Sequence, residues 1–224
     1  MTVLDQTTDL ALSAAMREGS MAEHQAAEDS SFMADLLGGK VNERGYADYL
    51  LRLRVVYATM EEIVAAHRDD AAVAAVADAA LERLAAIDAD LDHWLGQETA
   101  PGDRSVDSPA AEAYRQRLLA AAAEWPTLLV AHHYTRYLGD LSGGQAIGRI
   151  LDRTFELDGA GISFYSFAEI PKPKIYKDGY RARLDALGLS AEEQERVVTE
   201  VKTAFQLNQA LFAELGQNLE AYAR

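Results

Sequence analysis

The stretch AHHYTRYLGDLSGGQAIGRI, residues 131–150, begins and ends with the apolar spacing of an amphipathic helix. It also contains Gly139, Gly143, Gly144 and Gly148. A glycine inside a helix costs about 1 kcal/mol relative to alanine, so this density has a structural cause. Gly139 and Gly143 are four residues apart and share one helix face, which leaves a shallow groove without side chains. The pattern indicates either a close approach to a flat ligand or tight packing against another segment.

The pentapeptide LSGGQ, residues 141–145, matches a signature of ABC-transporter ATPases. That function requires a P-loop, and the only GGK, at 38–40, is followed by Val41 and lacks the upstream glycine. The chain also lacks the strand pattern of an α/β nucleotide-binding fold. We interpret the match as a coincidence.

The remaining sequence reads as a succession of amphipathic helices without a convincing strand. Apolar residues recur at helical spacing over 8–30, 43–68, 71–96, 110–123, 126–155 and 175–187, and over about 25 residues that follow Ser190. Ser190 and Glu193 form a capping-box pattern at the start of the last helix. Residues 157–173 are irregular, and QETAPGDRSVDSP at 97–109 is the clearest loop. We expect an all-α bundle of roughly seven or eight helices.

Composition narrows the classes of function. The 224 residues are 49% hydrophobic, enough for one sizeable core, and the net charge of −15 disfavours nucleic acid and anionic membranes as partners. The absence of cysteine excludes disulfides, thiolate metal sites and iron–sulfur clusters, and it fits a reducing cytoplasm. No apolar run could act as a membrane anchor, and the first residues do not resemble a secretory signal. We expect a cytoplasmic monomer with one domain over residues 1–224, whose ends, about 1–8 and 217–224, are flexible.

The histidines offer one candidate iron ligand. They are His24, His67, His93, His132 and His133, and no H-x-x-x-H or E-x-x-H spacing supports a di-iron site. One histidine suffices for heme, because the porphyrin supplies the other nitrogens, although a lone helix histidine is more often a surface or packed residue. His24 has the best surroundings. Glu28, one turn on, can accept the second ring N–H directly or through water, and Arg17, two turns back, can reach the rim of a ligand.

A basic cluster occupies PKPKIYKDGYRAR, residues 171–183. Its charged residues are Lys172, Lys174, Lys177, Arg181 and Arg183, and Lys177 and Arg181 share a helix face. A solvated patch is the default interpretation of such a run. The sharper hypothesis is that it binds a dianion such as the two propionates of heme.

Four segments together resemble the heme oxygenase family, in its eukaryote-like bacterial form. They are HQAAEDSSFMADLLGGK (24–40), HHYTRYLGDLSGGQ (132–145), KIYKDGYRARLDAL (174–187) and AFQLNQALFAEL (204–215). They resemble, in this order, the proximal-helix region, the family signature, the propionate-binding segment and the last core helix. The matches run in family order from about residue 10 to residue 216.

The resemblance implies that heme lies between a proximal helix and a kinked distal helix. His24 would be the iron ligand, with Glu28 near its ring. Gly139 and Gly143 would lie against the distal face of heme and allow the kink. Asp140 would not bind iron but would organise waters that donate hydrogen bonds to iron-bound O₂.

The resemblance also implies the surrounding contacts. Tyr57, Arg136 and Asn208 would form the network behind Asp140, and Tyr134, Lys177 and Arg181 would contact the propionates. Arg17 stands where family members have lysine, so the charge is kept while the hydrogen-bond geometry changes. The other expected heme contacts are Ser142, Gly144, Phe205 and Asn208.

The implied activity is oxidative cleavage of heme b at the α-meso carbon to biliverdin, CO and Fe²⁺, with heme as both cofactor and substrate. O₂ is required, and an external reductase must supply the electrons, because the chain has no flavin or nicotinamide motif. A ferredoxin-, flavodoxin- or reductase-type partner would dock at a basic rim that includes Lys174 and Arg183. The alternative is a heme-binding or heme-transfer protein that leaves its ligand intact; it would share His24 and the basic cluster but would not need Asp140.

Overall fold

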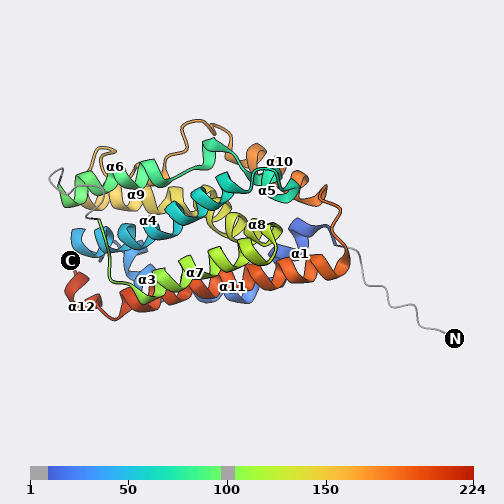
Figure 1. The fold of residues 1–224 in the computed structure, drawn as a ribbon. Coiled ribbons are helices and arrows are strands. Elements are labelled where there is room, and N and C mark those ends of the chain that lie inside the picture. The colour runs from blue at the N-terminus through green and yellow to red at the C-terminus, as the bar shows by residue number, and fades with distance from the viewer. Residues whose placement is uncertain (1–9, 97–103) are drawn as a thin grey trace.

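The computed structural model describes residues 10–96 and 104–224, which fold as an all-α bundle, as predicted (Figure 1). Within these ranges no strand is present, and the only β pairing is an isolated bridge between Val41 and Ala223. The α-helices are α1 (Leu12–Gly19), α2 (Met21–Glu28), α3 (Ser31–Leu37), α4 (Glu43–Ala66), α5 (Ala71–Val76), α6 (Leu84–Leu95), α7 (Pro109–Glu124), α8 (Leu129–His133), α9 (Gln145–Phe155), α10 (Pro173–Asp185), α11 (Ala191–Gly216) and α12 (Leu219–Tyr222). None of the described helices is long and apolar enough to cross a membrane.

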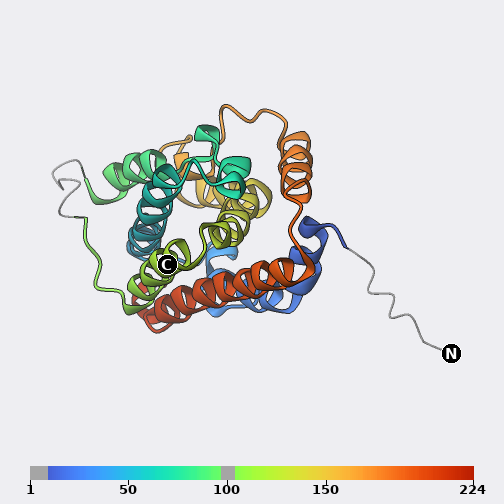
Figure 2. The same cartoon turned by 45° about the vertical axis from the view of Figure 1, so that its right-hand side comes forward.

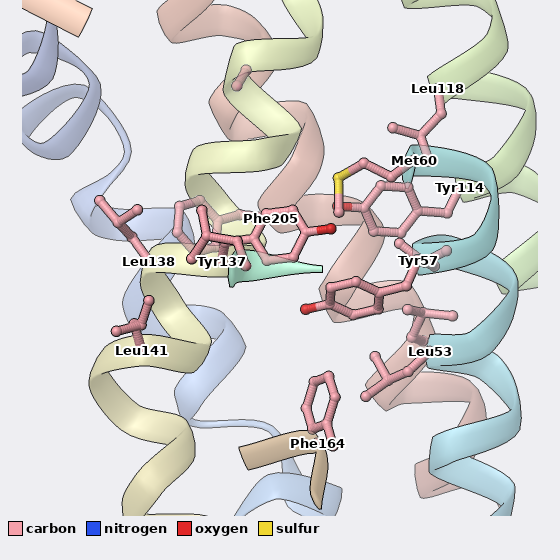
Figure 3. Packing of buried hydrophobic residues seen from close by; sticks show 14 of the residues in the cluster. Leu53, Tyr57, Met60, Tyr114, Leu118, Tyr137, Leu138, Leu141, Phe164 and Phe205 are labelled. Atoms are coloured by element: carbon pink, nitrogen blue, oxygen red, sulfur yellow. The ribbon is translucent and has the colours of Figure 1, made fainter. Parts of the chain in front are cut away.

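The core forms around α4, which packs against α6 and α7, while α11 runs along one side of the bundle (Figures 1 and 2). Figure 3 shows Leu53, Tyr57 and Met60 of α4 beside Tyr114 and Leu118 of α7, with Tyr137, Leu138 and Leu141 on the facing segment. All of these side chains are buried. Burying a leucine-sized side chain stabilises the fold by about 1.5–3 kcal/mol, so this layer fixes the position of α4 relative to residues 134–144.

The expected first helix, 8–30, is divided in two at Ser20. The Ser20 hydroxyl donates a hydrogen bond to the Met16 carbonyl at 2.8 Å, an alternative to continued helix pairing. Gly19 packs so closely on α11 that a Cβ there would lie 2.5 Å from Val198 Cγ1. The chain therefore begins a new helix, α2, shortly before His24.

The expected helix over 71–96 is likewise interrupted, between α5 and α6. Asp78 caps the intervening 3₁₀ turn by accepting from the Ala80 amide at 3.0 Å. Glu61 of α4 accepts from the Arg83 amide at 2.6 Å and from the Leu84 amide at 3.0 Å. Side-chain acceptors thus replace helical carbonyls here and override the helix propensity of the alanines.

The glycine-containing stretch is helical but widened. After a 3₁₀ turn at Pro126–Leu128 and α8, two π-helical segments follow, η4 (Tyr134–Leu138) and η5 (Asp140–Gly144), before α9. π-Helical turns are rare and are found mostly where function requires them. The two π-helical segments are the irregularity that the glycines predict. Residues 134–144 form the distal segment.

Both ends of the chain are expected to be flexible, and the C-terminal end differs from this expectation. Residues 1–8 lie outside the described residues, as does the first part, 97–103, of the expected loop. Residues 217–224 are held in place: the Asn42 amide donates to the Tyr222 carbonyl at 2.7 Å, and the Tyr222 hydroxyl donates to Asp48 at 2.6 Å. The predicted capping box of Ser190 and Glu193 is confirmed at the start of α11.

Candidate active site

A cavity with two connected parts lies between α2 and the distal segment. The outer cavity has a volume of about 540 Å³, and the inner chamber has a volume of about 130 Å³. Residues that line both parts are His24, Glu28, Thr135, Gly139, Gly143 and Phe205. The outer cavity alone is within the range of small-molecule and cofactor sites, about 300–1,000 Å³.

His24 presents its imidazole to this cavity from α2. The side chain is 52% exposed, and its ring makes an edge contact with Phe205 at 5.3 Å between centroids. Glu28 Oε1 lies 3.7 Å from His24 Nε2, beyond hydrogen-bond distance. The ring is therefore accessible from the cavity, and Glu28 lies near it.

The four glycines of the distal segment and α9 divide into two pairs. A Cβ built on Gly139 or Gly143 would meet no atom within 4 Å, because both residues face the cavity. A Cβ on Gly144, which also lines the inner chamber, or on Gly148 would lie 3.0 Å from Tyr165. The packing interpretation is thus confirmed at Gly144 and Gly148, and Gly139 and Gly143 remain candidates for contact with a ligand. The cavity-facing pair leaves bare backbone with room for a flat ligand, which is the shape of heme.

Asp140 is buried behind this bare backbone and belongs to a network from three helices. It accepts a short hydrogen bond from the Tyr57 hydroxyl of α4 and lies 3.5 Å from the guanidinium of Arg136. Arg136 in turn donates to the Tyr57 oxygen at 3.1 Å and to Asn208 Oδ1 of α11 at 2.9 Å. Asp140, Arg136 and Asn208 also line the inner chamber, whereas Tyr57 lies behind it.

The charge state of Asp140 is set by opposing effects. Burial raises the pKa of its carboxyl, and this outweighs the positive charge of Arg136 and the hydrogen bond from Tyr57, which both lower it. A buried carboxyl whose pKa is raised exchanges protons nearer to neutrality than an exposed one. The arrangement can position water in the inner chamber and move a proton to or from it.

Cationic and phenolic groups gather at the outer cavity. Arg17, Tyr134 and Arg181 line it, together with Ser142. Lys177 does not line it; its ammonium donates to the Ser142 hydroxyl at 2.8 Å. Burial, and then the neighbouring charge of Arg181, lower the pKa of Lys177. Neighbouring cations of this kind favour binding of an anion such as a carboxylate.

The basic cluster at 171–183 is not one surface. The Lys174 ammonium is exposed and lies 3.2 Å from Asp178. Arg183 instead donates to the Ala75 carbonyl of α5 at 2.7 Å, and its guanidinium lies over the Tyr180 ring. Arg183 thus ties α10 to α5 while its side chain stays exposed.

Several lining residues were not singled out from the sequence. They are Met33, Tyr49, Ile147, Tyr165 and Phe212 in the inner chamber and Met21 in the outer cavity. Tyr49 follows the helical spacing of apolar residues in α4. This spacing predicts a buried side chain, and it does not show whether that side chain packs in the core or lines a cavity. No sequence signal separates these residues from ordinary core positions.

Comparison with known proteins agrees with this geometry. A protein-family model described as heme oxygenase matches residues 10–214. A heme oxygenase of the alga Pyropia yezoensis is 37% identical over 91% of this chain and 85% of its own. The crystal structure of heme oxygenase-1 from the cyanobacterium Synechocystis, in complex with heme, matches with a TM-score of 0.89 and 35% identity over 95% of both chains. The heme oxygenase structure from Leptospira interrogans matches with a TM-score of 0.87 and 36% identity, over 92% of this chain and 100% of that one. The chain belongs to the heme oxygenase family.

Proposed function

We propose that this heme oxygenase binds heme b between α2 and the distal segment, with His24 on the iron, and cleaves it at the α-meso carbon to biliverdin, CO and Fe²⁺. One observation carries the proposal. His24 and the bare backbone of Gly139 and Gly143 line the same cavity from different helices, with the buried carboxyl of Asp140 beside the inner chamber. A site that only stored heme would not need this carboxyl.

Binding combines one axial ligand with anchors at the cavity mouth. His24 would supply a ring nitrogen without the electron push of a thiolate. Arg17, Tyr134 and Arg181 line the outer cavity and would hold the propionates, joined by Lys177 when it releases Ser142. These anchors would fix the in-plane orientation of heme and thus which meso carbon lies in the inner chamber.

On the other face, O₂ would meet no competing side chain at Gly139 and Gly143. The backbone there would limit the positions open to O₂ above the heme face, where the heme would supply the redox chemistry. Asp140 would hold water within reach of the oxygen, while Tyr57 and Arg136 fix its carboxyl. Proton delivery through that water, without direct contact to iron, is the role that its position supports.

Electrons would come from a separate protein. Lys172 and Lys174 begin α10 beside Ile175, which is 65% exposed. Two cations next to an apolar side chain suit an acidic ferredoxin, flavodoxin or reductase that docks on a cytoplasmic monomer. Charge reversal at both lysines should slow electron transfer at low salt. An unchanged rate would reject this docking surface.

The function is tested by adding heme, a reductant and O₂ to the purified protein and recording its absorption spectrum. Loss of the Soret band, growth of a biliverdin band and release of CO are the expected result. A persistent oxy-heme spectrum without CO would overturn the proposal, because it describes a carrier that leaves heme intact.

A further inference from the structure

We propose that Tyr49 is a positioning residue of the inner chamber, and that its hydroxyl donates a hydrogen bond to the water that Asp140 also holds. The inference rests on the proposed heme site and names a residue that the network of Tyr57, Arg136 and Asn208 does not include. Tyr49 lies on α4 and is 4% exposed, and it lines the inner chamber together with Asp140 and Arg136.

The aromatic ring of Tyr49 is fixed by its neighbours. It packs against Phe32 at 5.6 Å and against Phe212 at 6.1 Å between ring centroids. Aromatic pairs at these distances stabilise one ring orientation over others. The hydroxyl is therefore held at one place in the chamber wall and does not sample several.

The Tyr49 hydroxyl has no hydrogen-bond acceptor among the described residues, and the residue lines the inner chamber. Burial and the charge of Asp140 raise the pKa of Tyr49 despite the opposing charge of Arg136, so the phenol keeps its proton at neutral pH. The charged groups that line the same chamber are Arg136, which can only donate, and Asp140, which can accept. The geometry therefore leaves a water in the chamber as the acceptor of this O–H.

The chamber has the size and polarity to hold the acceptor. Its volume of about 130 Å³ exceeds by far the 10–15 Å³ or so that one water requires, and a buried water needs two to four polar partners. Asp140, Arg136, Asn208 and Tyr49 provide them. A water bound to Tyr49 and Asp140 would connect a phenol donor to the place where oxygen reacts.

Tyr46 supplies a matched control on the same helix. Its ring lies 6.4 Å from that of Tyr49, and its hydroxyl is fully buried without a hydrogen-bond partner among the described residues. Tyr46 does not line the inner chamber. The two tyrosines therefore share residue type, helix and burial, and differ in access to the chamber.

The test compares ferric heme complexes of the wild type, Tyr49→Phe and Tyr46→Phe. In such a complex, the pH at which an iron-bound water becomes hydroxide reports the hydrogen bonds that reach it. Loss of a donor disfavours hydroxide, so Tyr49→Phe should raise this transition by about 0.5–1 pH unit, a three- to tenfold change in proton affinity. Tyr46→Phe should leave it at the wild-type value.

Hydrogen peroxide released per heme consumed gives a second readout. We expect the peroxide released per heme to rise at least about twofold in Tyr49→Phe and to stay unchanged in Tyr46→Phe. Without the Tyr49 hydroxyl, the water beside the reacting oxygen is no longer held in place. A Tyr49→Phe complex with the wild-type transition and wild-type peroxide release, or equal shifts in both variants, would overturn the role of Tyr49. If the wild-type protein bound heme without degrading it, the proposed function would be rejected. The pH of the water-to-hydroxide transition would still decide whether Tyr49 donates to the water.

Discussion

The two helical walls of the cavity are built in opposite ways. On α2, only Ala27 is buried, and His24 is half exposed with one ring contact to Phe205. The distal segment is buried along most of its length, and its Asp140 and Arg136 are held by Tyr57 of α4 and Asn208 of α11. On the proposed function, the difference teaches that an axial ligand need only be accessible, whereas groups that position water near oxygen are fixed by the core. Substitutions on α2 should therefore affect function alone, and substitutions in the distal network should affect function and stability together.

The largest effect on turnover is expected from His24→Ala. Biliverdin formation should fall by at least about 100-fold, because the iron loses its protein ligand. The free energy of unfolding should stay within about 0.5 kcal/mol of the wild type, because the side chain contributes little packing. Turnover assays and urea unfolding measure the two quantities. His67→Ala, at the end of α4 and outside the cavity lining, is the control and should retain activity. Wild-type turnover in His24→Ala would refute the assignment of the iron ligand.

Asp140→Ala should come next and should affect both properties. Heme binding should persist, but biliverdin yield should fall about 10- to 100-fold, with turnover diverted toward peroxidase-like oxidation of added reductants. The free energy of unfolding should fall by about 1–3 kcal/mol, because Tyr57 and buried Arg136 lose their carboxylate partner. Asp140→Asn retains a carbonyl acceptor for Tyr57. Its free energy of unfolding should therefore return toward the wild-type value to a greater extent than its biliverdin yield. Normal biliverdin yield from Asp140→Ala would remove this carboxyl from the mechanism.

The two glycine pairs allow the ligand face and the packing face of this stretch to be separated. Gly143→Ala should leave the unfolding free energy equal or raise it by about 0.5–1 kcal/mol, while heme affinity falls about tenfold, because the methyl group enters the cavity. Gly148→Ala should cost about 1 kcal/mol of stability and leave heme affinity nearly unchanged. Its methyl group meets Tyr165, in a turn that Asp90 holds through the Ser163 and Phe164 amides. Heme titration and urea unfolding measure both quantities, and equal losses of affinity would contradict the division.

The smallest effect on turnover is expected for the buried carboxyl of Glu200, which contacts His132 of α8 at 2.7 Å and is paired with Arg117. Burial opposes ionisation of Glu200, but hydrogen bonds from His132 and Arg117 outweigh it and lower its pKa from 4.5 to about 2. A carboxyl whose pKa is lowered in the folded state stabilises the fold above its unfolded pKa. This stability, about 3 kcal/mol, is lost as the pH falls from about 4.5 to 2.

Glu200→Gln should remove that part of the pH dependence and leave neutral-pH turnover within about twofold. Urea unfolding between pH 2 and pH 6 measures it. Glu62→Gln, on an exposed position of α4, should follow the wild-type curve. A Glu200→Gln curve as steep as that of the wild type would show that this carboxyl does not contribute.

Much of the fold and of the site could be predicted from the sequence, for physical reasons that also explain the failures. Glycines four apart identified the cavity face of the distal segment, and the resemblance selected His24 from five histidines. The break at Ser20 and the interruption before α6 could not be predicted, because Val198, which packs on Gly19, and Glu61, which accepts from the Arg83 amide, are remote in sequence. The bond from Arg183 to the Ala75 carbonyl could not be predicted either, because charge alone does not reveal a backbone acceptor on another helix. From the sequence, Tyr49 is interpreted as a core residue, because residues that pack in the core and residues that line a cavity recur at the same helical spacing.

The central claim is that α2 holds the iron through His24 and that the distal segment does not bind it. Resonance Raman spectra of the ferrous heme complexes test this claim most directly, through the iron–histidine stretching band. The band should appear in the wild type and in Asp140→Ala, and it should be absent from His24→Ala and return as an iron–imidazole band when imidazole is added. A band that persists in His24→Ala without imidazole would contradict the account, because another residue would then hold the iron.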